Sequence, residues 1–79
     1  MREKIKRYLT ELAHDEALQD TTELFAGQFI DSLALLQLVD FIEKEFGIRV
    51  EGMEIVQDNF KDIIAIERFV RNKQEDTRG

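Results

Sequence analysis

Apolar residues recur at helical spacing in three stretches of the chain. In the first stretch, four of them fall at i, i+3, i+4 and i+7: Ile5, Tyr8, Leu9 and Leu12. This spacing predicts a helix over residues 3–13 with one buried face. The last stretch follows Asp62, an expected N-terminal cap, and predicts a helix over residues 63–72. We expect the polar segment 73–79 to be frayed.

The middle stretch is the most apolar and predicts a helix over residues 32–46. It contains neither glycine nor proline until Gly47, where a left-handed residue is expected to end the helix. Asp31 is expected to cap its start, because a carboxylate accepts backbone N–H bonds and suits the positive end of the helix dipole. Ser32 is therefore predicted to stand exposed at the point where a loop becomes a helix.

This second helix offers two faces. Its buried stripe is expected to come from apolar residues at helical spacing: Leu35, Leu38, Phe41 or Ile42, and Phe46. The neighbouring face mixes apolar and polar residues: Leu33, Leu36, Gln37 and Asp40. Such a face suits the docking of a partner protein, but Leu33 and Leu36 could equally widen the buried face. The spacing of these residues fits both interpretations.

The connection between the first two helices, residues 15–31, shows no sustained period. A connection this long in a small domain packs on the core or serves a function. We expect Phe25 and Phe29 to pin it to the bundle, with a short helical turn over residues 21–25 and a bend at Gly27.

Together these elements predict an all-α fold in one domain of 79 residues. The architecture expected is a small three- to four-helix bundle with a long ordered loop between helices one and two. A further short helical turn is predicted within residues 52–57. With no cysteine in the chain, helix packing rather than disulfides must stabilise the fold.

Composition excludes most catalytic chemistry. There is one histidine and no cysteine, so neither a thiol nucleophile nor a Cys/His zinc site can form. Ser32, His14 and an aspartate would make a triad by residue type only. No glycine-rich phosphate loop occurs, and the spacing of Asp58 and Asp62 does not fit a calcium loop. We therefore expect no metal site and no independent enzyme.

The net charge of −6 is unevenly distributed. Residues 11–67 contain 14 acidic and three basic residues, a local balance of −11. This balance argues against nucleic-acid binding and favours docking onto basic patches of partner proteins. No stretch approaches the roughly 20 apolar residues that span a membrane, and no apolar signal segment follows the basic start. We expect a cytoplasmic monomer without membrane insertion.

Taken together, residues 23–70 resemble the acyl carrier family, within the superfamily of acyl, aminoacyl and peptidyl carriers. The segments that carry this resemblance are Glu23-Leu24-Phe25, Phe29-Ile30-Asp31-Ser32-Leu33, Leu38-Val39-Asp40-Phe41-Ile42-Glu43-Lys44-Glu45-Phe46-Gly47-Ile48 and Asp58-Asn59-Phe60-Lys61-Asp62-Ile63. The resemblance implies that Ser32 takes 4'-phosphopantetheine from coenzyme A through a separate phosphopantetheinyl transferase. It implies that Asp31 helps to present Ser32, and that the thiol of the arm holds acyl or aminoacyl groups as thioesters.

The resemblance also implies docking of partner enzymes on five residues: Leu33, Leu36, Gln37, Asp40 and Glu43. The partners implied are the transferase, an acyl- or aminoacyl-activating ligase, and a downstream acyltransferase or condensing enzyme. The chain departs from the common fatty-acid pattern, which has Gly-Ala at Phe29-Ile30 and an acidic residue at Ala34. These departures favour a specialised pathway over general fatty-acid synthesis. The alternative is an unmodified acidic interaction module that acts as a structural subunit of a complex.

Overall fold

A computed structural model describes residues 1–16 and 18–78 of the chain. Within these residues the regular elements are four α-helices and one short 3-10 helix: α1 (Arg2–Ala13), α2 (Ser32–Phe46), η1 (Gly52–Glu54), α3 (Gln57–Phe60) and α4 (Ile63–Arg78). The prediction of an all-α bundle is confirmed. The first two helices begin and end within one residue of their predicted bounds.

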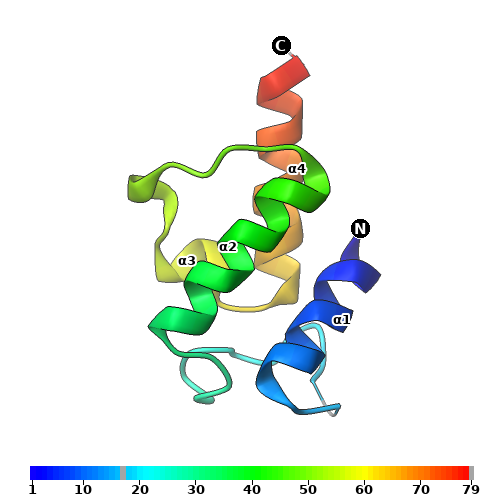
Figure 1. Ribbon diagram of the computed structural model, residues 1–79, viewed down its shortest axis with the longest axis vertical. Coiled ribbons are helices and arrows are strands. Elements are labelled where there is room, and N and C mark those ends of the chain that lie inside the picture. Colours follow the sequence, from blue (N-terminus) through cyan, green and yellow to red (C-terminus); the bar gives the residue numbers. More distant parts are fainter. Residues whose placement is uncertain (17, 79) are drawn as a thin grey trace.

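The helices pack around α4, which lies behind α2 in Figure 1. α4 contacts α1, α2 and α3, and α1 also packs on α2. The long loop after α1 passes below the bundle and leads into the N-terminus of α2 (Figure 1). On the other side of α2 from α1, the segment that carries η1 leads into α3 (Figure 1).

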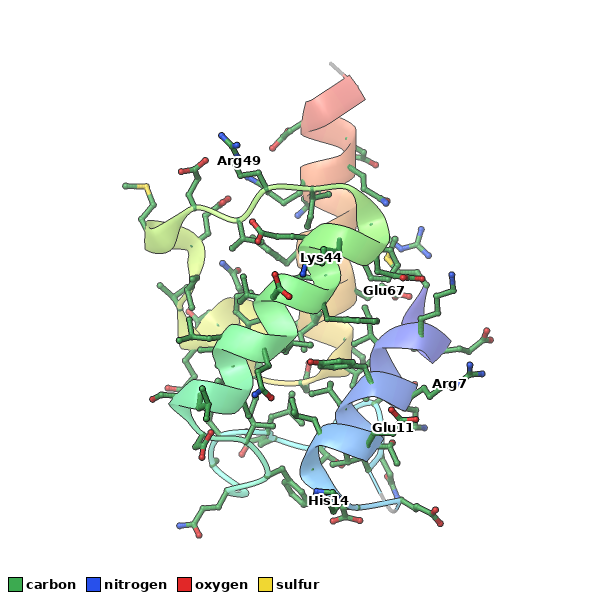
Figure 2. The ribbon with its side chains drawn as sticks, in the orientation of Figure 1. Arg7, Glu11, His14, Lys44, Arg49 and Glu67 are labelled. Atoms are coloured by element: carbon green, nitrogen blue, oxygen red, sulfur yellow. The ribbon has the colours of Figure 1, made fainter. Side chains whose placement is uncertain are left out.

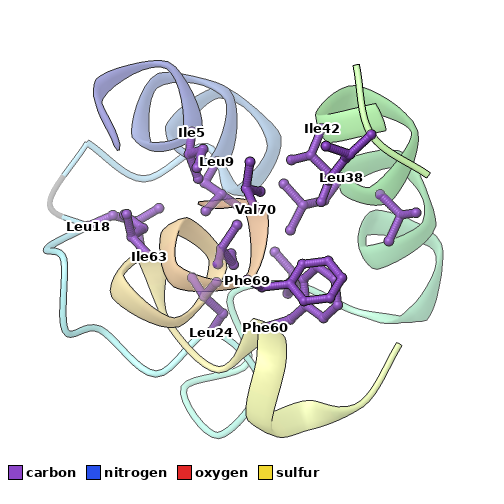
Figure 3. Packing of buried hydrophobic residues seen from close by; sticks show 14 residues of the cluster. Ile5, Leu9, Leu18, Leu24, Leu38, Ile42, Phe60, Ile63, Phe69 and Val70 are labelled. Carbon is purple, nitrogen blue, oxygen red and sulfur yellow. The ribbon is translucent and has the colours of Figure 1, made fainter. Parts of the chain in front are cut away.

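The core takes apolar side chains from all four α-helices and from the long loop (Figure 3). Nine large side chains in it are fully buried: Ile5, Leu9, Leu24, Leu38, Ile42, Phe60, Ile63, Ile66 and Val70. On the side of α2 toward α1, the ring of Tyr8 stacks on Phe41 with centroids 4.2 Å apart. From the stripe predicted on α2, Leu38 and Ile42 are fully buried, while Phe41 is half-buried.

The loop between α1 and α2 is anchored by Leu24 more than by the two phenylalanines predicted to pin it. Leu24 is fully buried, whereas Phe25 and Phe29 are half-buried against the core. The backbone of Leu24 is also fixed at both ends: its N–H donates to the Lys61 carbonyl at 2.8 Å, and its carbonyl accepts from Phe29 and Ile30. These bonds place the turn at residues 24–28, so the short helical turn predicted over residues 21–25 begins three residues later.

The last helix runs six residues beyond its predicted end. Asp62 caps its start as predicted, since its Oδ1 accepts from Ala65 N at 2.8 Å. Beyond Asn72 two side chains tie α4 to the rest of the fold. Lys73 Nζ lies 2.9 Å from a Glu54 carboxylate oxygen, and Gln74 donates to the Phe46 carbonyl at 3.4 Å. Residues 73–78 are therefore helical and not frayed, and Gly79 lies outside the described residues.

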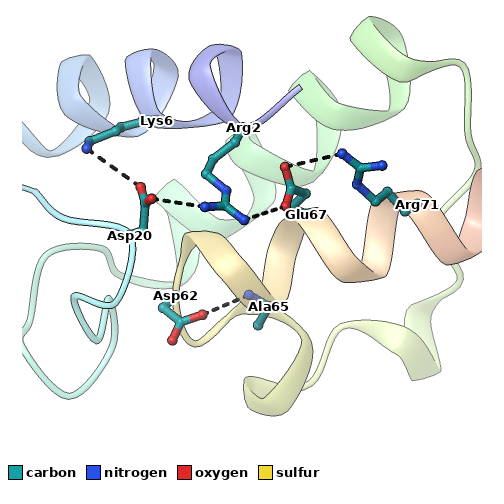
Figure 4. Close-up of polar contacts among 7 residues, drawn as sticks. All are labelled: Arg2, Lys6, Asp20, Asp62, Ala65, Glu67 and Arg71. Atoms are coloured by element: carbon teal, nitrogen blue, oxygen red, sulfur yellow. Dashed lines mark hydrogen bonds and ion pairs between the residues drawn. The ribbon is translucent and has the colours of Figure 1, made fainter.

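An ion-pair network joins α1, the long loop and α4 (Figure 4). The Arg2 guanidinium lies 2.8 Å from Glu67 and 3.2 Å from Asp20. Lys6 also faces Asp20 at 3.6 Å, and Arg71 faces Glu67 at 3.8 Å. The hydrogen bond from Arg2 is the main cause that holds the pKa of the Glu67 carboxyl below its usual range.

This network predicts a loss of stability in acid. Because the pKa of Glu67 is lower in the folded than in the unfolded chain, its contribution is complete above the ordinary carboxylate pKa and is lost as the pH falls through the folded value. We expect urea midpoints to fall between about pH 5 and pH 3. Glu67→Gln should flatten that fall, whereas Glu11→Gln, at an exposed position on α1, should leave it unchanged. Equal pH profiles for Glu67→Gln and the parent protein would contradict this assignment.

Candidate functional site

Asp31 and the first turn of α2 form the local structure expected at the candidate site. Asp31 has an extended backbone (φ −110°, ψ −171°), and its Oδ1 accepts from Ala34 N at 2.8 Å. Its carbonyl accepts the first helical hydrogen bond, from Leu35 N at 2.9 Å. The predicted N-cap is confirmed. The other predicted helix signal, Gly47, ends α2 with φ 65°.

Ser32 is the first residue of α2 and is exposed. Since Asp31 already caps the helix, the Ser32 hydroxyl is not needed for capping. Across residues 1–16 and 18–78 no hydrogen bond holds this hydroxyl. The first turn contains no acidic side chain after the cap, so the Asp31 carboxylate is the one acidic group of this turn and its cap that faces the positive end of the helix dipole.

The outward face of α2 exposes two leucines. Leu33 is 66% exposed and Leu36 is 58% exposed, so the interpretation that they widen the core is wrong. Gln37 and Asp40 are exposed beside them. Asp40 forms an ion pair with Lys44, one helical turn later, at 3.0 Å. Figure 2 shows Lys44 on α2, with α4 behind this helix.

Glu43 is placed differently from the other residues expected to dock partners. It is half-buried, and its Oε2 accepts a hydrogen bond from Val50 N at 2.9 Å. The carboxylate therefore holds the segment that follows α2 against this helix.

The segment after α2 exposes two more apolar side chains that the sequence analysis did not single out. Met53 in η1 is 86% exposed, and Val56 just after it is 47% exposed. The available signal was three apolar residues without any period in the short stretch between Glu51 and Asp58. From the sequence, such a stretch fits either an exposed loop or a buried segment. Only the tertiary structure shows that these two side chains face solvent.

Glu54 fixes the shape of that segment. Its carboxylate accepts from Glu51 N at 2.9 Å, which forms a capping box for η1, and also pairs with Lys73 of α4. Its carbonyl accepts from Val56 N at 2.9 Å and from the Asn59 side chain at 2.8 Å. The hydrogen bond from Glu51, followed by that from Lys73, lowers the pKa of the Glu54 carboxyl. Met53 is thus exposed on a turn that these hydrogen bonds and the ion pair hold in place.

Comparison with known families decides the class of this protein. Residues 3–69 match the family described as the phosphopantetheine attachment site. The chain belongs to this family of carrier domains. Its cofactor is covalently bound 4'-phosphopantetheine, and carrier domains of this kind are not themselves catalysts. No individual curated protein matches the chain.

Membership in the carrier family also implies its general partners, a phosphopantetheinyl transferase and biosynthetic enzymes. The residues at the start of α2 fit the cofactor chemically. The linkage would be an anionic phosphodiester on a hydroxyl, and a helix N-terminus favours such an anion. The Ser32 hydroxyl meets this requirement, because it is exposed and no described residue forms a hydrogen bond with it.

The remaining candidate groups do not form a second site. His14 ends α1 in the left-handed conformation (φ 55°) and is exposed, as Figure 2 shows at the end of that helix. In the described part of the chain, no three histidine, cysteine or acidic residues cluster as metal ligands would. No helix among residues 1–16 and 18–78 is both long and apolar enough to cross a membrane.

Proposed function

We propose that this carrier bears 4'-phosphopantetheine on Ser32 and shuttles acyl or aminoacyl groups as thioesters between enzymes of a specialised pathway. The observation that carries the proposal is the exposed Ser32 hydroxyl at the first position of α2, which has no hydrogen-bond partner among the described residues and lies inside the segment matched by the attachment-site family. In loading, Ser32 Oγ forms a bond to the phosphorus next to pantetheine in coenzyme A. The phosphoanhydride bond breaks, adenosine 3',5'-bisphosphate leaves, and the transferase accepts the hydroxyl proton.

Intact-mass measurement tests this proposal. The purified protein is incubated with coenzyme A, Mg²⁺ and a broad-specificity phosphopantetheinyl transferase, and then fragmented to locate any added group. We expect the mass of one arm to be added within the peptide that contains Ser32. No gain in mass, or an arm at another residue, would overturn the proposal. Binding of a partner by protein that cannot be loaded would instead support the unmodified interaction module.

Two departures from the common fatty-acid pattern support a specialised pathway. Phe29 and Ile30 replace Gly-Ala before the attachment segment, and Ala34 replaces an acidic residue in the first turn of α2. Both changes lie where an enzyme that loads or unloads the arm would approach. Incubating the loaded carrier with amino acids, fatty acids and candidate ligases would identify the cargo class. Efficient acylation by the enzymes of general fatty-acid synthesis, and by no other ligase, would contradict the assignment to a specialised pathway.

The docking surface that we propose combines the exposed face of α2 with the turn after it. Its apolar centre consists of four exposed side chains: Leu33, Leu36, Met53 and Val56. Exposed acidic residues, among them Asp40, Glu51 and Asp58, flank this centre. An apolar centre with a charged rim is the usual composition of a transient protein interface, and the negative rim suits a basic partner. Glu43 contributes indirectly, because it positions the segment that leads to Met53.

We expect Leu36→Ser to weaken docking of the phosphopantetheinyl transferase. Loss of one well-exposed apolar anchor costs on the order of 1.4 kcal/mol, which corresponds to about a tenfold higher KM for the carrier. The kcat of loading should stay unchanged, since Leu36 lies a helical turn after the reacting Ser32 on α2. Arg68→Ser, at an exposed position on α4, serves as the control. A KM equal to that of the parent protein would exclude Leu36 from this docking surface.

Substitution of Asp31 separates capping from presentation to the transferase. Asparagine caps helices as well as aspartate does, so Asp31→Asn should leave the urea midpoint within error of the parent protein. Asp31→Ala should cost about 1 kcal/mol of unfolding free energy. If the charge of Asp31 helps to present Ser32, loading is slower in Asp31→Asn despite its intact stability. Unchanged loading in that variant would leave Asp31 with capping alone.

A further inference from the structure

An open groove of about 340 Å³ lies beside the N-terminus of α2. Its lining comes from three parts of the fold: Leu12 of α1, then Phe25, Gln28 and Phe29 of the long loop, and Asp31 and Ala34 at the start of α2. The groove therefore lies on the side of α2 that faces α1 and the loop. The segment with Met53 lies on the other side of α2 (Figure 1).

The loop wall of this groove is closely packed. A Cβ added at Gly27 would lie 2.6 Å from a ring carbon of Phe29 and 2.7 Å from the Glu23 carbonyl oxygen, so only glycine fits there. The turn is also held by hydrogen bonds from Gly27 N to the Glu23 carbonyl and from Phe29 N to the Leu24 carbonyl. Leu24 is fully buried, so the hydrogen bond from Phe29 N attaches Phe29 to a fixed part of the fold.

Gln28 supplies a polar group at the edge of the groove. Its φ is 60°, a left-handed conformation that is strained for a residue with a side chain. Its side chain is exposed and carries both a donor and an acceptor. Glycine would adopt this backbone more easily, so the glutamine places an amide here at a local cost in stability.

We propose that the pantetheine part of the arm rests in this groove when no partner is bound. This inference depends on the proposed attachment at Ser32. Ser32 lies in the sequence between Asp31 and Ala34, which both line the groove, so a tethered arm is present there at an effective concentration on the order of millimolar. A weak affinity is then sufficient to hold it.

The chemistry of the groove matches pantetheine rather than its phosphate. Pantetheine alternates amides with apolar carbons, including a carbon that bears two methyl groups. The rings of Phe25 and Phe29 offer an apolar surface to those methyls, and the Gln28 amide can pair with an amide of the arm. The carboxylate of Asp31 lines the groove and disfavours the anionic phosphate inside it. The aromatic Phe29 thereby gains a role at a position where the common pattern has glycine.

Nuclear Overhauser contacts test the location of the arm. The carrier is loaded from coenzyme A that is isotope-labelled in its pantetheine part, and loading is verified by intact mass before the spectra are recorded. We expect contacts between the paired methyl groups of the arm and the ring protons of Phe25 and Phe29. Absence of these contacts in fully loaded protein, or contacts to Leu36 and Met53 instead, would overturn the inference. Failure to load would overturn the proposed function itself, so the two failures are distinguishable.

A pair of glutamine variants provides the matched comparison. Gln28→Gly removes the amide and relieves the left-handed backbone, whereas Gln19→Gly removes an exposed loop glutamine outside the groove. Both should be loaded to completion. The changes in backbone amide shifts that loading causes at Phe29 and Ala34 should fall by at least half in Gln28→Gly and persist in Gln19→Gly. Persistence of these changes in both variants would overturn the inference.

Discussion

Ser32→Ala is expected to abolish loading completely. Ser32 is the only serine of the chain, and alanine leaves no nucleophilic oxygen at the start of α2. The cap made by Asp31 does not involve the Ser32 side chain, and alanine is the strongest helix former. We therefore expect a far-ultraviolet circular dichroism spectrum and a urea midpoint like those of the parent protein. The loss should be seen as an unchanged intact mass after incubation with coenzyme A and transferase.

Thr21→Ala is the control for this loss. Thr21 carries an exposed hydroxyl on the loop. The Thr21→Ala variant should be loaded as fully as the parent protein. Addition of one arm to Ser32→Ala would show that another hydroxyl is the attachment point. Because the variant keeps its fold, a negative result cannot be attributed to unfolding.

Leu24→Ala is expected to have the largest effect on stability among loop substitutions. Leu24 is fully buried, although it lies in a loop, and truncation of a buried leucine to alanine costs about 2–5 kcal/mol. Small domains have only about 5–15 kcal/mol of unfolding free energy in total, and a chain this short is expected near the lower end. The substitution should therefore remove a large share of the stability, measured by urea unfolding.

Phe25→Ala is the matched comparison for Leu24→Ala. Phe25 is one residue away, larger, and only half-buried, so its truncation should cost less despite the greater loss of volume. The substitution that lowers the unfolding free energy more identifies the residue that anchors the loop. Phe25 and Phe29 pack against the core as predicted, and an equal or larger cost for Phe25→Ala would show that Phe25 anchors this loop at least as strongly as Leu24.

The sequence predicted those parts of the fold that depend on neighbouring residues. The caps at Asp31, Asp62 and Gly47 each act within four residues, and all three have the geometry expected of them. The face of α2 that carries Leu33 and Leu36 also follows from helical spacing. Its exposure did not, because two interpretations fitted the same pattern until the positions of α1 and α4 were known.

The features that the sequence did not predict depend on contacts between distant residues. Leu24 anchors the loop because it meets the carbonyl of Lys61, 37 residues later. α4 continues past Asn72 where Lys73 and Gln74 find partners on Glu54 and Phe46. The groove beside Ser32 exists because α1, the loop and α2 converge, which no local pattern indicates.

The bonds around Glu54 have a consequence for how partner choice can change in this protein. Because Lys73 of α4 pairs with the Glu54 carboxylate of the η1 capping box, the orientation of Met53 in the proposed docking surface depends on a residue of another helix. Substitutions in the last turns of α4 could thus retune which enzymes are recognised while every contacting side chain stays the same. The selectivity for partner enzymes would then depend partly on residues outside the proposed docking surface.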